Sequence, residues 1–430
     1  MLDIKFILEN QDQINHVIAN KNVAANLEQL VAYYENFRKL KLEIDLLKTE
    51  ANQIAAQMVK VTDKQELIKK GTDLKKTIKE QEEHFIIVEN LYKESLNLIP
   101  NVFAIDTPTG KDDNENVVIK HFMEPTTFEF TPKDHVELGE SLDLINFEAG
   151  SKVAGPKFYF LKNEAVLLEM ALKQFVIAKA MKAGFTIMQT PELAKNSILS
   201  GSGYAPRGNE SNSYVIEGED LSLIATSEIA IGGYHSGEVL DASKLPIKYA
   251  ADSHCFRTEA GGAGRVSKGL YRVHQFSKIE LYIFSKPEDS EALLEEILAL
   301  EEEIYQDLKI PYRVMRICAG DLGAPAYKKY DIEAWMPGRS MGGSYGEVTS
   351  ASSCTDFQAR RLNIKYKNQA TSKNEFVHTL NGTAIALSRT LIAVLENYQT
   401  KEGEILVPEV LRPLVSFNKI TKKSSQHINF

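Results

Sequence analysis

The chain has 430 residues, of which 43% are hydrophobic and 25% are charged. That length allows one large core and an additional domain, and the composition excludes collagen-like and low-complexity proteins. The formal net charge of −9 argues against indiscriminate nucleic-acid binding, because attraction to phosphate drives such binding, so any RNA contact requires a locally basic surface. We find no signal segment and no apolar run of bilayer-spanning length, and we expect a cytoplasmic protein without a membrane partner.

The first hundred residues predict two long helices that bury each other. Apolar residues recur at alternating steps of three and four from Leu30 to Val61, and the spacing resumes less regularly from Leu67 to Ile99. This is the a/d pattern of a coiled coil. Two such stretches joined by a short turn can fold back as an antiparallel hairpin.

The turn between the two stretches is basic. Residues 60–79 contain seven lysines and only three acidic residues. One interpretation is a solvated helix face. The other is a positive tip, on a projecting arm, that a long RNA element could contact.

The region after Pro100 predicts a change of domain. Residues 106–116 are rich in Pro, Gly, Asp and Asn and indicate a linker, so we expect an N-terminal domain at 1–105 and a second domain at 106–430. Beyond the linker, helices are predicted at 164–182, 289–308 and 383–398, and strands at 250–257, 271–284, 312–318, 330–336 and 376–380. Strands joined by hairpins, with helices set apart, predict an α+β domain built on an antiparallel sheet.

Common nucleotide and metal signatures are absent from the sequence. It contains no GxxxxGK[ST] loop and no GxGxxG opening a helix. The cysteines Cys255, Cys318 and Cys354 form no CxxC pair, and we expect small buried side chains rather than disulfides or zinc ligands. A bound nucleotide would therefore depend on arginines and backbone groups.

The most informative segment is residues 256–284, FRTEAGGAGRVSKGLYRVHQFSKIELYIF. Arg257 and Glu259 are two apart on a predicted strand, so both project to one face, and the glycine-rich loop after them carries Arg265. The returning strand adds Arg272, Gln275, Lys278 and Glu280 to this surface. The neighbours of His274 are expected to face the site, so alternation points His274 away. Arginines and carboxylates on one surface can clamp a phosphate and seat an ammonium group, although a surface hairpin with cross-strand ion pairs has the same composition.

This segment resembles the second signature motif of class II aminoacyl-tRNA synthetases, and the seryl family in particular. The helix ending at Gly184, followed by FTIMQTPEL, resembles the first motif, which forms the dimer interface in that family, and HTLNGTAIALSRTLIAVLENYQTKEGEILVPEVLRP resembles the third. Between and upstream of them, YDIEAWMPG, GEVTS, DFQARR, DHVELGE, FYFLKNEA and TSE also resemble the seryl family. The resemblance spans nearly the entire chain, including the N-terminal hairpin.

The resemblance implies a class II synthetase fold with an N-terminal coiled-coil arm. It implies that the chain activates L-serine with ATP in the presence of Mg²⁺, releases pyrophosphate, and transfers serine to the 3′-terminal adenosine of tRNA(Ser) and also of tRNA(Sec). A homodimer in which the arm contacts tRNA is implied as well. Because the serine carboxylate is itself the nucleophile, the reaction needs no covalent enzyme intermediate, and positioning and charge neutralisation carry the catalysis.

Carried over position by position, the resemblance assigns catalytic roles to Arg257, Glu347 and Arg389. Arg257 would hold the α-phosphate of ATP and Arg389 the γ-phosphate. The residues expected around ATP are Arg257, Thr258, Glu259, Val273, Phe276, Glu347, Val348, Thr349, Ser350 and Arg389, with Glu347 and Ser350 also binding the metal ion. Those expected around serine are Thr226, Ser227, Glu228, Arg257, Glu280, Asn381 and Thr383.

Thr383 has two interpretations. As part of a hydroxyl-reading pocket, it would help to reject alanine by roughly 10⁴-fold, because alanine leaves buried polar groups unpaired. As the first residue of the helix predicted at 383–398, it could instead be a helix cap. Family members usually have serine and glycine where this chain has Thr383 and Ala384, and glycine where it has Ser388.

Two other classes of function were weighed. A synthetase-derived ligase that loads an amino acid onto a carrier protein lacks the long arm, so the seams between Leu30 and Ile99 argue against it. A catalytically dead paralogue acting as a coiled-coil interaction protein would have no reason to keep Arg257, Glu280 and Arg389 together.

Overall fold

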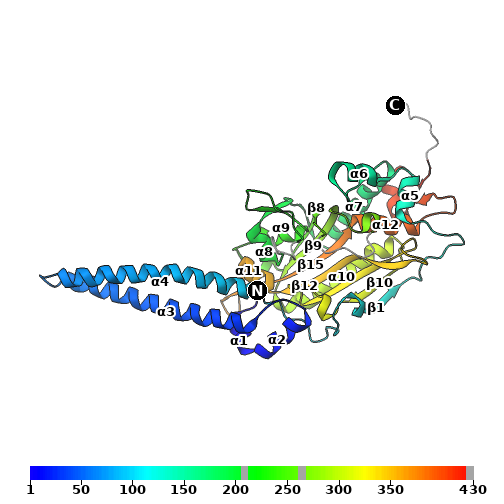
Figure 1. Cartoon of the computed structure of the whole chain (residues 1–430). Coiled ribbons are helices and arrows are strands. Elements are labelled where there is room, and N and C mark those ends of the chain that lie inside the picture. Colours follow the sequence, from blue (N-terminus) through cyan, green and yellow to red (C-terminus); the bar gives the residue numbers. More distant parts are fainter. Residues whose placement is uncertain (205–211, 260–267, 423–430) are drawn as a thin grey trace. The chain divides into compact units, whose positions relative to one another are not determined.

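The structure is a computed structural model that describes residues 1–204, 212–259 and 268–422. The chain divides into two compact units, Met1–Val102 and Phe103–Phe430. The first unit contains the short helices α1 (Ile4–Glu9) and α2 (Gln11–Asn20), followed by the long helices α3 (Leu27–Met58) and α4 (Gln65–Leu98), which run side by side (Figure 1). None of the described helices is both long and apolar enough to cross a membrane.

Helices α3 and α4 confirm the predicted hairpin. The Asn26 side chain caps the start of α3 by accepting from the backbone N–H of Gln29 at 2.9 Å. Along the seam, Leu30, Leu40, Ile44 and Ile54 of α3 and Val88 of α4 are buried, as the three-and-four spacing predicts. The Phe37 ring lies between two aromatic rings of α4, with centroids 5.2 Å from those of both Phe85 and Tyr92.

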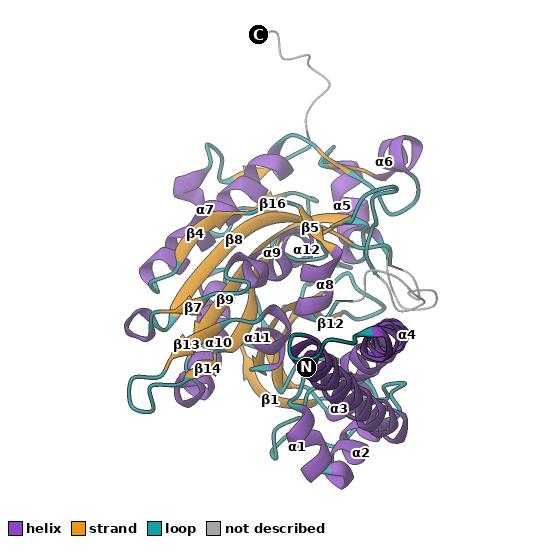
Figure 2. Ribbon diagram, turned by 90° about the vertical axis from the view of Figure 1, so that its left-hand side faces the viewer, coloured by secondary structure: helices purple, strands orange, loops and turns teal. Residues whose placement is uncertain are grey.

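The second unit is built on an eight-stranded sheet. Its strand order is β1 (Val117–Phe122), β10 (Tyr312–Arg316), β11 (Lys328–Met336), β12 (Ser344–Thr355), β15 (His378–Ala386), β9 (Gln275–Ser285), β8 (Ile247–Phe256) and β4 (Thr186–Gln189). All pairings between these strands are antiparallel except that of β4 with β8. Figure 2 shows β8 and β9 as long curved strands beside the shorter β4. The prediction of an antiparallel sheet in an α+β domain is confirmed.

Smaller elements complete this unit. The remaining α-helices of this unit are α5 (His135–Ser141), α6 (Phe147–Ala154), α8 (Asn196–Ser202), α9 (Ser227–Tyr234) and α11 (Phe357–Leu362). The remaining strands are β2 (Ile145–Asn146), β3 (Phe160–Leu161), β5 (Leu193–Lys195), β6 (Leu221–Leu223), β7 (Val239–Leu240), β13 (Lys365–Lys367), β14 (Asn374–Phe376), β16 (Ile405–Leu406) and β17 (Lys419–Ile420).

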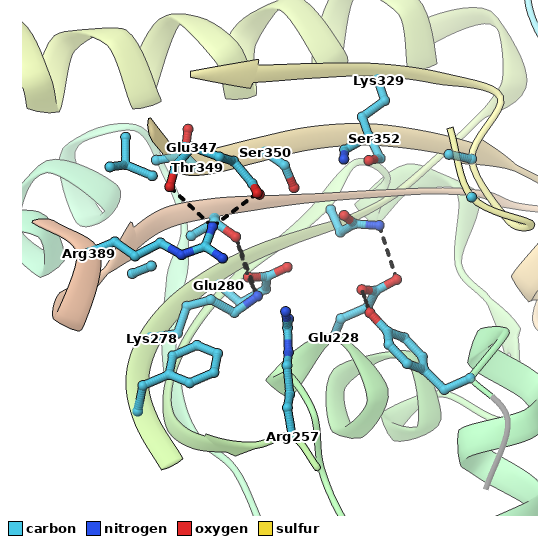
Figure 3. A pocket seen from close by; sticks show the side chains of 18 of the residues that line it. Glu228, Arg257, Lys278, Glu280, Lys329, Glu347, Thr349, Ser350, Ser352 and Arg389 are labelled. Carbon is cyan, nitrogen blue, oxygen red and sulfur yellow. Dashed lines mark hydrogen bonds and ion pairs between the residues drawn. The ribbon is translucent and has the colours of Figure 1, made fainter. Parts of the chain in front are cut away.

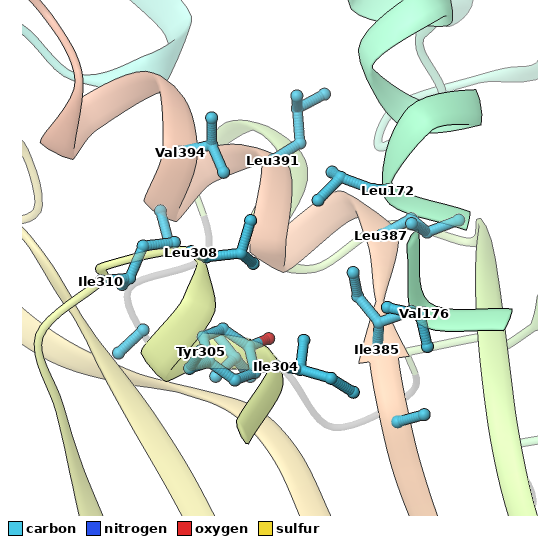
Figure 4. Packing of buried hydrophobic residues seen from close by; sticks show 14 of the residues in the cluster. Leu172, Val176, Ile304, Tyr305, Leu308, Ile310, Ile385, Leu387, Leu391 and Val394 are labelled. Atoms are coloured by element: carbon cyan, nitrogen blue, oxygen red, sulfur yellow. The ribbon is translucent and has the colours of Figure 1, made fainter. Parts of the chain in front are cut away.

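Alternation along β9 separates the core face of the sheet from the other face. Ile279, Leu281 and Ile283 belong to the main core cluster together with α7 (Glu164–Lys182), α10 (Ser290–Asp307) and α12 (Leu387–Asn397). Figure 4 shows side chains of these three helices meeting in that core. The alternate residues Tyr282 and Phe284 pack instead with residues of α9 and α11. Polar side chains on that second face are therefore free of the main core and can form a site.

The structure corrects two predicted boundaries. The helix predicted at 383–398 begins at Leu387, because the preceding residues continue β15, which is paired on both sides with β12 and β9. Thr383 consequently lies within a strand, and its interpretation as a helix cap is wrong. The strand predicted at 271–284 begins at Gln275, because Gly269–Tyr271 forms a short 3-10 turn.

Candidate active site

A cavity of about 320 Å³ opens on the second face of the sheet. Its walls come from stretches far apart in the chain: the end of β8, the strands β9, β12 and β15, and the start of α12. Arg257 and Arg389, predicted to act on one ligand from distant segments, both line it. Figure 3 shows the two guanidinium groups pointing into the same space from different sides.

Arg389, on the first turn of α12, is held in place by four contacts, one of which is a hydrogen bond from Nη1 to the carbonyl oxygen of Glu347 at 3.1 Å. Its Nε donates to the carbonyl oxygen of Tyr271 at 3.3 Å, and its Nη1 lies 3.0 Å from Oε2 of Glu347. The guanidinium carbon also lies 4.7 Å from the centroid of the Tyr271 ring. Burial acts to raise the pKa of Glu347, but the positive charges of Arg389 and Lys329 outweigh it and lower that pKa to about 2. This carboxylate is therefore ionised throughout the physiological pH range.

Arg257 and Glu259 line the cavity just after β8 ends at Phe256. The prediction that both residues lie on the strand is wrong, because the backbone turns after Phe256 and Glu259 has a φ of 51°. The Arg257 guanidinium lies 5.3 Å from the Phe276 ring centroid, and Glu259 pairs with Arg272 at 3.0 Å. The glycine-rich loop that follows, including Arg265, lies outside the described residues.

The end of the cavity next to α9 holds a buried carboxyl group. Glu228 accepts hydrogen bonds from the Tyr204 hydroxyl at 2.9 Å, from Gln358 Nε2 at 2.7 Å and from Asn381 Nδ2 at 3.0 Å. Burial raises its pKa, although the hydrogen bond from Gln358 and the charge of Lys278 act against that shift. These donors leave Glu228 fixed in orientation at the edge of the cavity.

A second buried carboxyl group, Glu280, lies on β9 and is 2% exposed. Its Oε2 atom accepts from the Thr383 hydroxyl at 3.2 Å and forms a salt bridge with Lys278. Lys278 Nζ in turn lies 3.3 Å from the same hydroxyl. Burial raises the pKa of Glu280 to about 7, against the opposing charge of Lys278. Glu280 is thus poised to change its charge near neutral pH.

The structure brings most of the predicted site residues together and leaves three aside. Those that line the cavity are Glu228, Arg257, Glu259, Val273, Phe276, Glu280, Glu347, Val348, Thr349, Ser350, Asn381, Thr383 and Arg389. Thr226 caps α9, Ser227 is buried in its first turn, and Thr258 turns its hydroxyl to Asn212 at 3.2 Å. These three side chains do not border the cavity.

Other cavity residues were not predicted. Tyr204 directly precedes residues 205–211, which the structure does not describe, and no periodic pattern marks its position. Tyr271 was expected to begin a strand but lies in the 3-10 turn before it. Lys329 lies on β11, two residues before Asp331, with which it pairs at 3.2 Å. Strand alternation could have predicted that Lys329 and Asp331 share one face of β11, but it could not have predicted that β12 pairs with this strand.

The oxygen ligands in the cavity suit a hard divalent cation. Glu347 supplies an ionised carboxylate, and the side chain of Ser350 lines the same wall. Among the residues that the structure describes, no three His, Cys, Asp or Glu side chains cluster closely enough to hold a metal by themselves. A Mg²⁺ ion at Glu347 would therefore complete its shell with oxygens of a bound phosphate and water, as is usual for this ion.

The remaining singled-out side chains are structural. Cys255, Cys318 and Cys354 are buried and unbridged, as predicted, although Cys354 also lines the cavity. His274 is not part of the cavity wall. Its Nδ1 lies 2.8 Å from the Tyr214 hydroxyl and 3.0 Å from the carbonyl oxygen of Arg257.

Comparison with known proteins gives a consistent result over the whole chain. A family model of the seryl-tRNA synthetase N-terminal domain matches residues 1–103, and one of the class II tRNA synthetase core domain (G, H, P, S and T) matches residues 214–398. A serine–tRNA ligase of Treponema denticola is 50% identical over 423 residues, covering 98% of this chain and 100% of that protein.

Solved structures agree with this result. The seryl-tRNA synthetase of Pyrococcus horikoshii complexed with ATP has a TM-score of 0.89 at 38% identity, covering 99% of this chain and 100% of that one. The cytoplasmic serine–tRNA ligase of Naegleria fowleri in complex with AMP has a TM-score of 0.82 at 33% identity, covering 96% of both chains. The chain therefore belongs to the seryl-tRNA synthetase family of class II aminoacyl-tRNA synthetases.

Proposed function

We propose that this chain is a serine–tRNA ligase that activates L-serine with ATP and transfers it to tRNA. The observation that carries the proposal is the convergence of Arg257 and Arg389 on one cavity, which Glu228 and Glu280 also line. The arginines attract phosphate, and the carboxyl groups attract an ammonium group. The complexes of the relatives with ATP and AMP support the nucleotide at the arginine end.

In the activation step, an oxygen of the serine carboxylate attacks the α-phosphorus of ATP. The bond from that phosphorus to the bridging oxygen breaks, and pyrophosphate leaves. Arg257 neutralises the α-phosphate, Arg389 binds the γ-phosphate, and Phe276 and Val273 lie beside the adenine. Glu259, Val348 and Thr349 complete the nucleotide site, whereas Thr258 acts from behind the cavity wall through its contact with Asn212. Because the substrate supplies the nucleophile, no covalent enzyme intermediate forms.

Mg²⁺ fits this site through Glu347 and Ser350. When bound, the ion would neutralise charge on the phosphates. The salt bridge from Arg389 keeps the Glu347 carboxylate ionised and oriented toward the cavity. Lys329 adds a further positive charge on the same side.

The serine site is proposed at the acidic end. The ammonium group pairs with the carboxylates of Glu228 and Glu280, and the serine hydroxyl reaches the polar cluster around Thr383 and Asn381. Thr226 and Ser227 act behind these residues, because they fix the first turn of α9, from which Glu228 projects.

Transfer of serine to tRNA is proposed to depend on the first unit. The hydroxyl of the 3′-terminal adenosine attacks the carbonyl carbon of the adenylate, and AMP leaves. Helices α3 and α4, with the lysines of residues 60–79 at the turn, contact the backbone of the long variable arm of tRNA(Ser) and tRNA(Sec). These substrates place the proposed enzyme in the cytoplasm.

A second copy of the chain is proposed as a partner. Helix α7 exposes apolar side chains, with Val166, Leu167 and Met170 having 39%, 45% and 62% of their surface exposed. An isologous contact through α7 and β4, the segment that resembles the first class II motif, would cover them.

The proposal is tested by pyrophosphate exchange into ATP. We expect exchange with serine, at least about 10⁴-fold weaker exchange with alanine, and none without an amino acid. Arg257→Ala should abolish the exchange. Arg313→Ala is the matched control, since Arg313 lies outside the cavity and pairs with Glu333 at 2.6 Å. Exchange that is independent of serine, or selective for alanine, would refute the substrate assignment.

A further inference from the structure

A third arginine lies close to the proposed triphosphate site. Arg339 follows β11, and its guanidinium carbon lies 4.0 Å from the centroid of the Tyr271 ring, which also carries Arg389 at 4.7 Å. Because both guanidinium carbons lie close to the centroid of the same ring, the distance between them cannot exceed the sum of their two distances to that centroid. Both positive charges border a single aromatic ring in the wall of the cavity.

The charge of Arg339 is not compensated within the described part of the chain. Arg389 pairs with Glu347 and Lys268 pairs with Asp134, but no described carboxylate pairs with Arg339. Its Nη1 atom is buried and has no hydrogen-bond partner among the described residues. A guanidinium group held in this way is unfavourable by itself and is stabilised by an anion.

Gly346 makes the position of Arg339 possible. A Cβ atom at residue 346 would lie 1.9 Å from Arg339 Nη1 and 3.0 Å from Cε2 of Tyr271, so any side chain there displaces the guanidinium. Gly346 directly precedes Glu347, the carboxylate proposed to bind Mg²⁺ and the partner of Arg389. Arg339 is thus packed against the backbone that forms the phosphate end of the site.

A second cavity, of about 720 Å³, is the one that Arg339 lines, because Arg339 does not line the first cavity. It shares Tyr271 with the first cavity and is also lined by Arg339 and Lys268. Because Lys268 already has Asp134 as a partner, Arg339 is the cation in that wall without a described counter-ion. An anionic group that extends past Tyr271 from the first cavity would meet it.

We propose that Arg339 is a further ATP-binding residue, which binds the β- and γ-phosphates beside Arg389 and retains pyrophosphate until release. This assignment rests on the proposed function, because it takes ATP as the ligand of the first cavity. Arg257 acts at the α-phosphate, whereas Arg339 and Arg389 act at the distal phosphates. Binding of AMP, which lacks those phosphates, is consequently independent of Arg339.

The test compares the Kd for ATP with the Kd for AMP, both measured by isothermal titration calorimetry of the full chain. Arg339→Ala should raise the Kd for ATP about tenfold and leave that for AMP unchanged, as expected for one charge-assisted hydrogen bond. Arg339→Lys keeps the charge and should recover part of the loss, whereas Arg339→Met keeps only the packing on Tyr271 and should not. Gly346→Ala should weaken ATP binding, with a smaller effect in the Arg339→Ala background.

Three outcomes overturn the inference. Equal weakening of ATP and AMP, or full recovery with Arg339→Met, would mean that Arg339 acts only by packing on Tyr271. An unchanged Kd for ATP in Arg339→Ala would mean that Arg339 has no role in ATP binding. Failure of the serine–tRNA ligase proposal is distinguishable, because it appears in the wild-type chain as ATP binding without serine-dependent pyrophosphate exchange. Unfolding temperatures of all variants identify any that fail to fold.

Discussion

Replacing Glu280 with glutamine tests the acidic end of the cavity. Glu280 is 2% exposed and its pKa is about 7, because burial outweighs the charge of Lys278. If its carboxylate binds the ammonium group of serine, only the ionised form is active. In the wild-type chain, kcat/KM for serine should therefore fall toward tenfold per pH unit below about 7 and level off above it. Burial also raises the pKa of Glu228, the other carboxyl group proposed to bind the ammonium group.

The expected size of the effect follows from the charge that is lost. A hydrogen bond to a charged group contributes about 1.5–3 kcal/mol, so Glu280→Gln should lower kcat/KM for serine about 10–100-fold at pH 8. Near pH 6, where the wild-type carboxyl group is mostly protonated, the two proteins should differ much less. The KM for ATP should not change at either pH, because Glu280 contacts Thr383 and Lys278 rather than Arg389 or Glu347.

The same substitution has a signature in stability. The pKa of Glu280 is raised from 4.5 to about 7 in the folded chain, so between these values the folded state binds the proton more tightly than the unfolded state. The contribution of Glu280 is thus most favourable below pH 4.5 and decreases by about 3 kcal/mol as the pH rises through 7. Glu280→Gln removes this dependence.

Initial rates of pyrophosphate exchange and urea unfolding, both measured from pH 5.5 to 8.5, check these expectations. Glu404→Gln is the matched control, since Glu404 lies outside the cavity and pairs with Lys419 at 3.0 Å. If Glu280→Gln keeps the wild-type pH profile for serine, the proposed contact with the ammonium group is refuted.

Three further predictions concern other parts of the chain. Arg389→Ala should reduce pyrophosphate exchange about 10²–10³-fold, and Arg389→Lys should recover little because lysine lacks the planar fork; wild-type kcat in either variant would contradict the role of Arg389. Deleting residues 27–98 should leave serine-dependent exchange within about twofold but lower tRNA aminoacylation more than about 100-fold, through lost phosphate contacts; equal aminoacylation would contradict the role of the arm. Gly382→Ala should destabilise the fold by about 1–3 kcal/mol in urea unfolding, since its Cβ would lie 2.3 Å from Ile297 Cγ2. Adding Ile297→Ala, which removes Cγ2, should not relieve all of that strain, because Glu301 Oε1 would still lie 2.7 Å away.

Where a single periodic pattern governs burial, the fold follows closely from the sequence. The seams of α3 and α4 need only each other, so the spacing of Leu30, Leu40 and Ile44 predicts which side chains are buried. Helix α7 has the predicted bounds, Glu164–Lys182, ending before Gly184. The start of the helix after β15 differs from the prediction because local propensity does not report that β9 pairs with residues as far as Ala386, while β12 pairs with residues 379–382.

The candidate site depended more on resemblance than on pattern. Alternation on β9 correctly grouped Lys278 with Glu280, but no periodicity relates β9 to Arg389, more than a hundred residues later. Arg339 was missed for the same reason. Its relation to the cavity depends on Gly346 and Tyr271, which come to it from the two neighbouring segments of the folded chain.

The two ends of the cavity differ in how firmly their charge is fixed, and that difference matches the proposed division of labour. At the phosphate end, Arg389 and Lys329 lower the pKa of Glu347 to about 2, so its negative charge persists at any pH at which the protein functions. At the serine end, burial raises the pKa of Glu280 to about 7, so its charge is marginal until a cation arrives. A bound ammonium group would favour the ionised form, and serine binding should therefore release up to one proton from Glu280 near pH 7. Titrations of serine in buffers of different ionisation enthalpy would reveal that proton, and its absence would mean that another group carries the ammonium.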